Sequence, residues 1–288
     1  MTKAPAAKFG EYIQQIPTRD QNEKAAVPIE HFRYATAHAL RMVDYMIDLG
    51  KRAEFYEKGF RRHQKGMSML AFFQLVAAFE RLLKELAALC VDEVAPLCTD
   101  DRLNRFSIRG ADAAPHVRDQ TVGRALCESQ LWHDVNEVNL RFKDVLQLVK
   151  PNPTHKTPPE FKLFDENAKG SVRAERKSLL VIFQLRHTIA HNLGTLTRSD
   201  GGKLQRLVSR KLDSPKELDI DRLHVYYLQR FLSPLGEEIN QLISDRLGLV
   251  LTEFHADAPT LIDHQGRATE LSKLFRTSFT ISGFSAHP

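Results

Sequence analysis

The chain has 288 residues, of which 42% are apolar and 27% charged, a composition typical of a globular protein with a buried core. Lysine plus arginine exceed aspartate plus glutamate by 41 − 36 = 5, which permits a nucleic-acid partner without requiring one. Three cysteines without C-x-x-C spacing argue against a disulfide framework or a cysteine zinc site, and the lack of a signal-peptide-length or membrane-length apolar run predicts a cytoplasmic protein without membrane contact.

The N-terminal third of the chain predicts an irregular arm followed by two helices. Residues 1–28 contain three prolines and little periodicity. From Ile29 apolar residues recur every three or four positions, which predicts a helix to about Phe60 that ends in the basic cluster 61–65. The next helix has the strongest pattern and should end near Pro96. Its apolar stripe is Phe72, Val76, Phe79, Leu83, Leu86 and Cys90, widened by Leu75 and Leu82.

The middle of the chain, at about 99–170, predicts an insertion. Residues 99–118 mix charges with glycine and proline and predict a loop or a short excursion. Apolar spacing over 126–149 predicts one amphipathic helix, and four prolines within 151–159 predict a second loop.

A helix then resumes at about Val172, and Gly194 is expected to end it because glycine readily adopts the left-handed cap conformation. Residues 198–202 predict a turn, which suits a small hairpin. A long helix follows over 214–247, broken or kinked at Ser233-Pro234, and the tail from Thr252 has no clear element. The prediction is an all-α protein with a helical domain over 29–248 and a C-terminal extension over 249–288.

The segment 185–192 (LRHTIAHN) carries the most informative residues. Arg186 can hold a phosphate through two parallel hydrogen bonds, and His191 can transfer a proton near neutral pH. Relative to the centre of the apolar stripe on this predicted helix, Arg186 lies about 60° to one side. His187 and His191 lie about 160° away from that centre and face water, another segment or another subunit. That stripe is Ile182, Leu185, Ile189, Leu193 and Leu196. The last turn of a helix favours a protonated His191.

Spacing alone leaves simpler interpretations open, and it favours two surface histidines beside a surface arginine. H-x-x-x-H also puts two imidazoles on one helical face, as in zinc sites, but no H-E-x-x-H glutamate or third ligand lies nearby. No nucleotide-binding glycine loop or G-x-S-x-G occurs, and His31, His38, His133, His224 and His255 have no partner at a useful spacing.

Residues 186–192 (RHTIAHN) resemble the R-x(4–6)-H motif of the HEPN superfamily, in which a polar residue commonly follows the arginine. The upstream segment 72–83 (FFQLVAAFERLL) resembles an earlier HEPN helix, which often carries a Phe-Glu pair, here Phe79-Glu80. The order of a Phe-Glu helix, an insertion, a motif helix and a closing helix is also similar to that family, over roughly residues 30–248.

The resemblance implies an all-α bundle that dimerises, and a metal-independent endoribonuclease without a cofactor. Arg186 would bind the scissile phosphate, and His191 would transfer protons as the RNA 2′-hydroxyl attacks. The products would be a 2′,3′-cyclic phosphate and a 5′-hydroxyl. His187 stands where the family more often has Asn or Asp, so its supporting role stays open, as does that of Asn192 at the motif's end.

Glu80 sits about 80° from the stripe of its helix, which would let it point into the same cleft. An exposed ion pair with Lys84 is an equally good interpretation.

Two further basic sets could contact an RNA backbone: Arg61, Arg62 and Lys65, and Arg173, Arg176 and Lys177. Solvated helix surfaces are the alternative for both.

The sequence therefore predicts an RNA-cleaving homodimer that acts as a toxin or an antiviral-defence effector, with an antitoxin or another defence protein as a possible partner. The alternative is a catalytically silent helical module that binds RNA or protein and serves as an adaptor or antitoxin.

Overall fold

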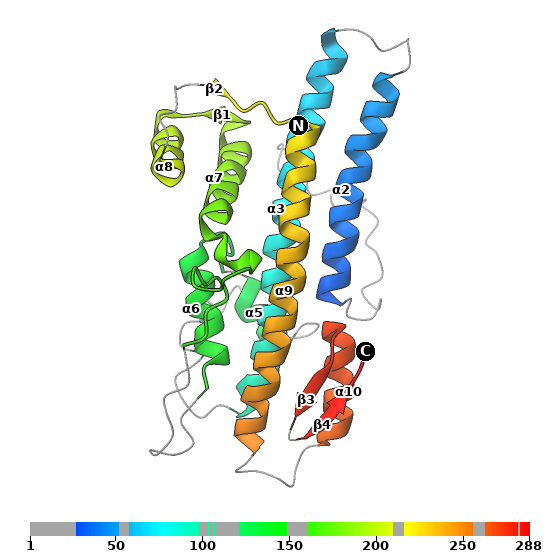
Figure 1. The fold of residues 1–288 in the computed structure, drawn as a ribbon, viewed down its shortest axis with the longest axis vertical. Coiled ribbons are helices and arrows are strands. Elements are labelled where there is room, and N and C mark those ends of the chain that lie inside the picture. The colour runs from blue at the N-terminus through cyan, green and yellow to red at the C-terminus, as the bar shows by residue number, and fades with distance from the viewer. Residues whose placement is uncertain are drawn as a thin grey trace, which may run out of the picture.

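Helices dominate the described chain, which confirms the all-α prediction. The computed structural model describes residues 27–51, 58–97, 103, 106, 121–128, 130–148, 160–209, 216–255, 263–281 and 283–288. Four helices run along the long axis: α2 (Pro28–Gly50), α3 (Lys58–Val94), α7 (Arg176–Asn192) and α9 (Arg222–His255) (Figure 1). In Figure 1, α2 and α7 run upward and α3 and α9 run downward, so each of these helices is antiparallel to the next one along the chain.

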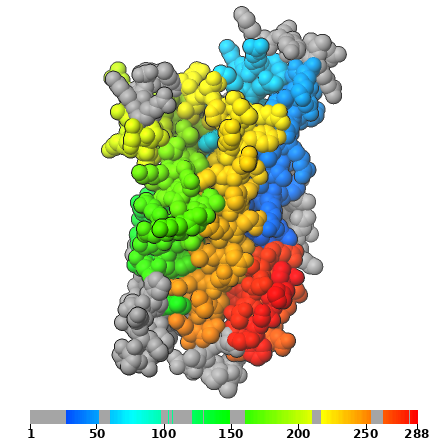
Figure 2. All heavy atoms as spheres, viewed as in Figure 1, coloured from blue at the N-terminus to red at the C-terminus, as the bar shows by residue number. Residues whose placement is uncertain are grey.

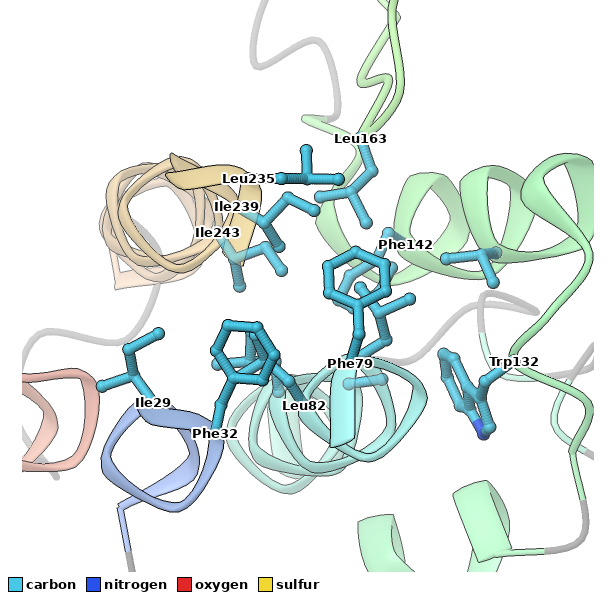
Figure 3. Close-up of a cluster of buried hydrophobic side chains, with 14 of the residues drawn as sticks. Ile29, Phe32, Phe79, Leu82, Trp132, Phe142, Leu163, Leu235, Ile239 and Ile243 are labelled. Carbon is cyan, nitrogen blue, oxygen red and sulfur yellow. The ribbon is translucent and has the colours of Figure 1, made fainter. Parts of the chain in front are cut away.

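The central helix is α3, which contacts α2, α5 (Val122–Glu128), α6 (Val135–Leu146), α7 and α9. All eight residues of its predicted apolar stripe are buried, and Phe79 lies between Phe32 of α2, Phe142 of α6 and Ile239 of α9 (Figure 3). Within the part of the chain that the structure describes, one helix, at Phe60–Leu97, is long and apolar enough to cross a membrane by length and composition alone. Its place at the centre of the bundle accounts for that composition, because a core helix is covered on several faces.

The boundary between the first two helices differs from the prediction. Helix α2 ends at Gly50 rather than near Phe60, and the basic cluster 61–65 lies in the first turns of α3. A Cβ atom on Gly50 would stand 2.3 Å from the Phe60 ring, so the absent side chain lets the two helices approach closely there. Periodicity could not reveal this boundary, because the residues on both sides of it are helical. The arm at 1–26 lies outside the described residues.

The predicted helix over 126–149 is two helices, α5 and α6, with a break before Val135. Asp134 caps α6, and its side chain accepts hydrogen bonds from the backbone N–H groups of Asn136 and Glu137. The Trp132 indole donates to the carbonyl of Cys127 at 3.0 Å. An aspartate cap starts a new helix even within a continuous apolar pattern. Residues 99–102, 104–105, 107–120 and 149–159 of the predicted insertion lie outside the described residues.

The sequence predicted a break or a kink at Ser233-Pro234, and the break is wrong, because α9 continues through Pro234 to His255. Leu232 and Leu235 on either side are buried in the core, and their packing offsets the hydrogen bond that proline cannot donate. The helix begins at Arg222 rather than 214.

The predicted turn at 198–202 is also wrong, because these residues begin α8 (Arg198–Val208). Thr197 caps this helix by accepting a hydrogen bond from the Asp200 N–H, so residues with turn preference start a helix instead. A strand pair does follow the motif helix, but β1 (Thr195–Leu196) pairs antiparallel with β2 (Lys216–Glu217), beyond α8. It is therefore not a local hairpin. A short 3-10 turn, η5 (Val172–Ala174), precedes α7, and another, η2 (Ala95–Leu97), follows α3.

The C-terminal segment, which the sequence leaves without a clear element, forms α10 (His264–Phe275), β3 (Phe279–Ile281) and β4 (Phe284–Ala286). The two strands pair antiparallel, and this unit packs against α9 and the beginning of α2 (Figures 1 and 2). Phe275 and Phe279 are buried and stack at 6.1 Å in the same core as α3. The predicted boundary at 248 falls inside α9, so residues after it share the core.

Candidate active site

Arg186 is placed on α7 by two residues of α3. Its Nη2 donates to Glu80 Oε2 at 3.2 Å, and its guanidinium carbon lies 5.1 Å from the centre of the Phe73 ring. The side chains of Arg186 and Glu80 are only 20% and 14% exposed. Of the two interpretations that the sequence left open for Glu80, the structure shows the contact with the motif arginine, whereas the pair with Lys84 is not formed, since Lys84 bonds to Glu128 at 2.9 Å.

This ion pair leaves some of its buried hydrogen-bonding atoms without a partner among the described residues. Glu80 Oε1 and Arg186 Nε are buried and have no hydrogen-bond partner among the described residues. Burial raises the pKa of the Glu80 carboxyl, and the positive charge of Arg186 acts in the opposite direction. A guanidinium held by one contact to a carboxylate retains donors that could turn toward an anionic ligand.

The two motif histidines lie side by side at the exposed end of α7. Their ring centres are 4.5 Å apart with planes tilted by 48°, and His191 is exposed while His187 is half-buried. Helix α7 ends at Asn192, so His191 stands in its last turn, as predicted.

Part of the predicted apolar stripe of α7 is wrong. Ile189 is buried, but Leu193 is 87% exposed, and the buried residues nearer the start of the helix are Leu179 and Phe183. Leu193 lies beyond the helix in a left-handed conformation with φ 49°, which turns its side chain away from the stripe. Gly194 follows with φ 83° and donates its backbone N–H to the Thr188 carbonyl, so the glycine adopts the left-handed conformation predicted for the end of this helix.

His133 lies outside the motif, on the loop between α5 and α6, and burial lowers its pKa. The charges of Arg186, His187 and His191 act on its imidazole. A pattern of local spacing could not select His133, because the charges that act on it belong to α7, far along the chain. Its convergence with α7 results from packing of the α5–α6 region against α3 and α7.

Asn192 does not join the arginine–histidine group. Its side chain donates to Asp200 Oδ2 at 2.8 Å, and Gln184 donates to Asp200 Oδ1 at 3.0 Å. The Thr197 hydroxyl bonds to the same carboxylate at 2.7 Å. The buried Asp200 side chain therefore ties the end of the motif helix to α8, and the sequence did not single it out because it looked like a turn residue.

The basic residues proposed to contact RNA are spread over separate places. Arg173 bonds to Glu238 at 2.9 Å, Arg176 pairs with Glu166 at 3.3 Å, and Lys65 pairs with Asp219 at 2.7 Å. These ion pairs connect elements of the bundle, which favours a structural role for their charges.

Lys177, Arg61 and Arg62 are exposed. Lys177 lines an open hollow of about 810 Å³ together with Arg230 and Phe231, and Arg61 lines a smaller one of about 310 Å³.

Among the described residues, no three His, Cys, Asp or Glu side chains gather in a way that could hold a metal ion. Cys90 and Cys127 are free and buried, and burial raises the pKa of Cys127 to about 12, which keeps it a thiol. No family model, curated protein or solved structure matches this chain.

Proposed function

We propose that this chain is a metal-independent endoribonuclease of the HEPN type that acts through Arg186 and His191. The observation that carries the proposal is that Arg186, held by Glu80 and Phe73, stands on the same helix as the adjoining rings of His187 and His191 at the end of α7. A guanidinium neutralises a phosphate that gains charge, and an imidazole donates or accepts the proton of a ribose oxygen. Together they supply what a metal ion would otherwise supply for attack by a 2′-hydroxyl.

The test is cleavage of single-stranded RNA by purified wild type, Arg186→Ala and His191→Ala, each with and without EDTA. We expect each variant to lose at least about 100-fold in rate, because each removes one acid–base or charge-stabilising group. Wild-type activity should withstand EDTA and leave 2′,3′-cyclic phosphate and 5′-hydroxyl ends. His224→Ala is the matched control, since that exposed histidine pairs with Asp221 at the start of α9. Wild-type rates in both motif variants would refute the proposal.

The proposed molecule is a cytoplasmic homodimer whose paired motifs form one cleft. Two exposed leucines support this, because exposed apolar side chains can mark a protein interface. Leu193, directly after the motif, is 87% exposed, and Leu131, two residues before His133, is 62% exposed. Sedimentation equilibrium measures the assembly state. A toxin or defence role predicts growth arrest on expression of wild type but not of His191→Ala, and an antitoxin or other defence protein is the proposed partner.

A second candidate is a catalytically silent module that binds RNA or protein. The Arg186–Glu80 ion pair favours it, because the carboxylate already accepts one hydrogen bond from the guanidinium. RNA binding without cleavage, unchanged in His191→Ala, would identify this function.

A further inference from the structure

The larger hollow, of about 810 Å³, lies between the segment that leads into α7 and the first half of α9 (Figure 1). The wall formed by that segment is fixed to α9 through Glu238. This carboxylate accepts hydrogen bonds from the Arg173 guanidinium at 2.9 Å and from the Val172 N–H at 3.0 Å, and the Ser171 hydroxyl donates to it as well. Because three donors hold this wall on one acceptor, the hollow is formed before any ligand arrives.

Two cations that line the hollow are available to a ligand. Lys177 and Arg230 are exposed, and among the described residues neither forms a hydrogen bond or an ion pair. The two carboxylates that line the hollow do have partners, since Glu166 pairs with Arg176 at 3.3 Å and Glu175 accepts a hydrogen bond from a serine hydroxyl at 3.0 Å. The charge left without a partner is therefore positive, which suits an anionic ligand.

The hollow also has an aromatic wall, and it lies on the face of α7 that carries the motif histidines. Phe231 is half-buried and lines the hollow beside Arg230. Lys177 precedes His191 by 191 − 177 = 14 residues, which places the two about 40° apart around the helix and about 21 Å apart along it. Both side chains are exposed. An extended RNA strand covers that distance with a few nucleotides.

We propose that this hollow is a second binding site for the RNA strand, a few nucleotides away from the site of cleavage. Lys177 and Arg230 bind a phosphate, and the Phe231 ring stacks on the neighbouring base, a combination by which proteins hold single strands. The hollow positions the strand and takes no part in the chemistry. This inference rests on the proposed function for its ligand, RNA.

The first experiment measures binding of a single-stranded 2′-O-methyl oligoribonucleotide, which has no 2′-hydroxyl to attack the phosphate, by fluorescence anisotropy. Lys177→Ala and Arg230→Ala should each weaken binding and lower the slope of log Kd against log salt by about 0.7. Phe231→Leu keeps an apolar side chain against the core but cannot stack on a base, so it should weaken binding at least about 5-fold. Lys273→Ala, which removes an exposed lysine of α10, is the matched control and should bind as wild type does.

The second experiment compares cleavage of a long substrate with cleavage of a dinucleotide, which is too short to reach from His191 to Lys177. Lys177→Ala should raise KM for the long substrate without changing kcat, and it should leave cleavage of the dinucleotide unchanged.

Wild-type affinity for the oligonucleotide in Lys177→Ala, Arg230→Ala and Phe231→Leu would overturn this inference and leave the proposed function standing. A nucleoside monophosphate that binds as tightly as the oligonucleotide would also overturn it, because the hollow would then be a site for a small molecule. Absence of cleavage by wild type, together with the expected losses of binding, would overturn the proposed cleavage and leave the RNA-binding hollow standing.

Discussion

At the scale of single residues, the arrangement around Arg186 shows how a charged group is held before it meets a ligand. Phe73 lies against its plane and Glu80 accepts one of its hydrogen bonds, so few rotamers remain open to the guanidinium. The carboxylate would also compete with the phosphate of the proposed RNA substrate for the same donors. Glu80 therefore positions Arg186 and lowers the affinity of its guanidinium for anions.

Replacement of Glu80 tests this role. Glu80→Ala should lower the free energy of unfolding by about 1–3 kcal/mol, because a mostly buried guanidinium loses its acceptor. It should also lower kcat/KM roughly 10- to 100-fold, because Arg186 is no longer oriented. Urea unfolding and RNA cleavage measure the two effects. The matched control is Glu85→Ala, which removes the partner of exposed Arg81 on the same helix and should leave cleavage unchanged.

The pH dependence of stability gives a second check on Glu80. Since burial raises its pKa, the folded protein binds this proton more tightly than the unfolded chain does. The free energy of unfolding contributed by this group is then present at low pH and is lost as pH rises through the folded pKa. Glu80→Gln removes this slope, and identical slopes in both proteins as pH rises above 4.5, the ordinary pKa of a glutamate, would contradict the assignment.

At the scale of helices and strands, the end of the motif helix depends on contacts that the sequence pattern does not reveal. Periodicity predicted α3 and α7 well, because their apolar spacing is local and continuous. It missed the start of α8 because Thr197 and Asp200 suit a turn and a helix cap equally. Arg186, His191 and Glu80 could be identified from the motif and from helical angles, which depend on local sequence. His133 and Asp200 lie near α7 only through packing between distant segments, which a local pattern does not reveal.

Asp200 fixes the position of α8 against the last turns of α7. Asp200→Ala would leave the amides of Gln184 and Asn192 without their acceptor, which should cost about 1–3 kcal/mol of folding free energy. It should also slow cleavage, because His191 lies in the turn that Asn192 ends. Asp200→Asn, which keeps one carbonyl acceptor, should retain more of both properties. Thermal unfolding and cleavage rates measure the effects, and an Asp200→Ala protein with wild-type stability would refute this stabilising role of Asp200.

At the scale of the whole molecule, residues from α2 to β3 contribute to one continuous hydrophobic core. The core runs from Trp132 beside α6 to Phe275 of α10, and α3 and α9 cross between these ends (Figures 1 and 3). The single tryptophan of the chain and the C-terminal unit thus report on opposite parts of the same core. A sequence pattern that favours a separate extension could not show this, because the apolar runs of the tail are short and their partners lie on α9 and α2.

This arrangement predicts that a cavity in the C-terminal unit destabilises the α5–α6 region as well. Phe275→Ala removes a fully buried ring and should lower the free energy of unfolding by about 3–5 kcal/mol. If the core unfolds as one unit, urea transitions followed by Trp132 fluorescence and by far-ultraviolet circular dichroism should shift to the same lower midpoint. Phe284→Ala is the matched control, since that ring of the adjacent strand is 44% exposed and should change stability by less than about 1 kcal/mol. A fluorescence transition that stays at the wild-type midpoint while the dichroism transition shifts would show instead that the C-terminal unit unfolds separately.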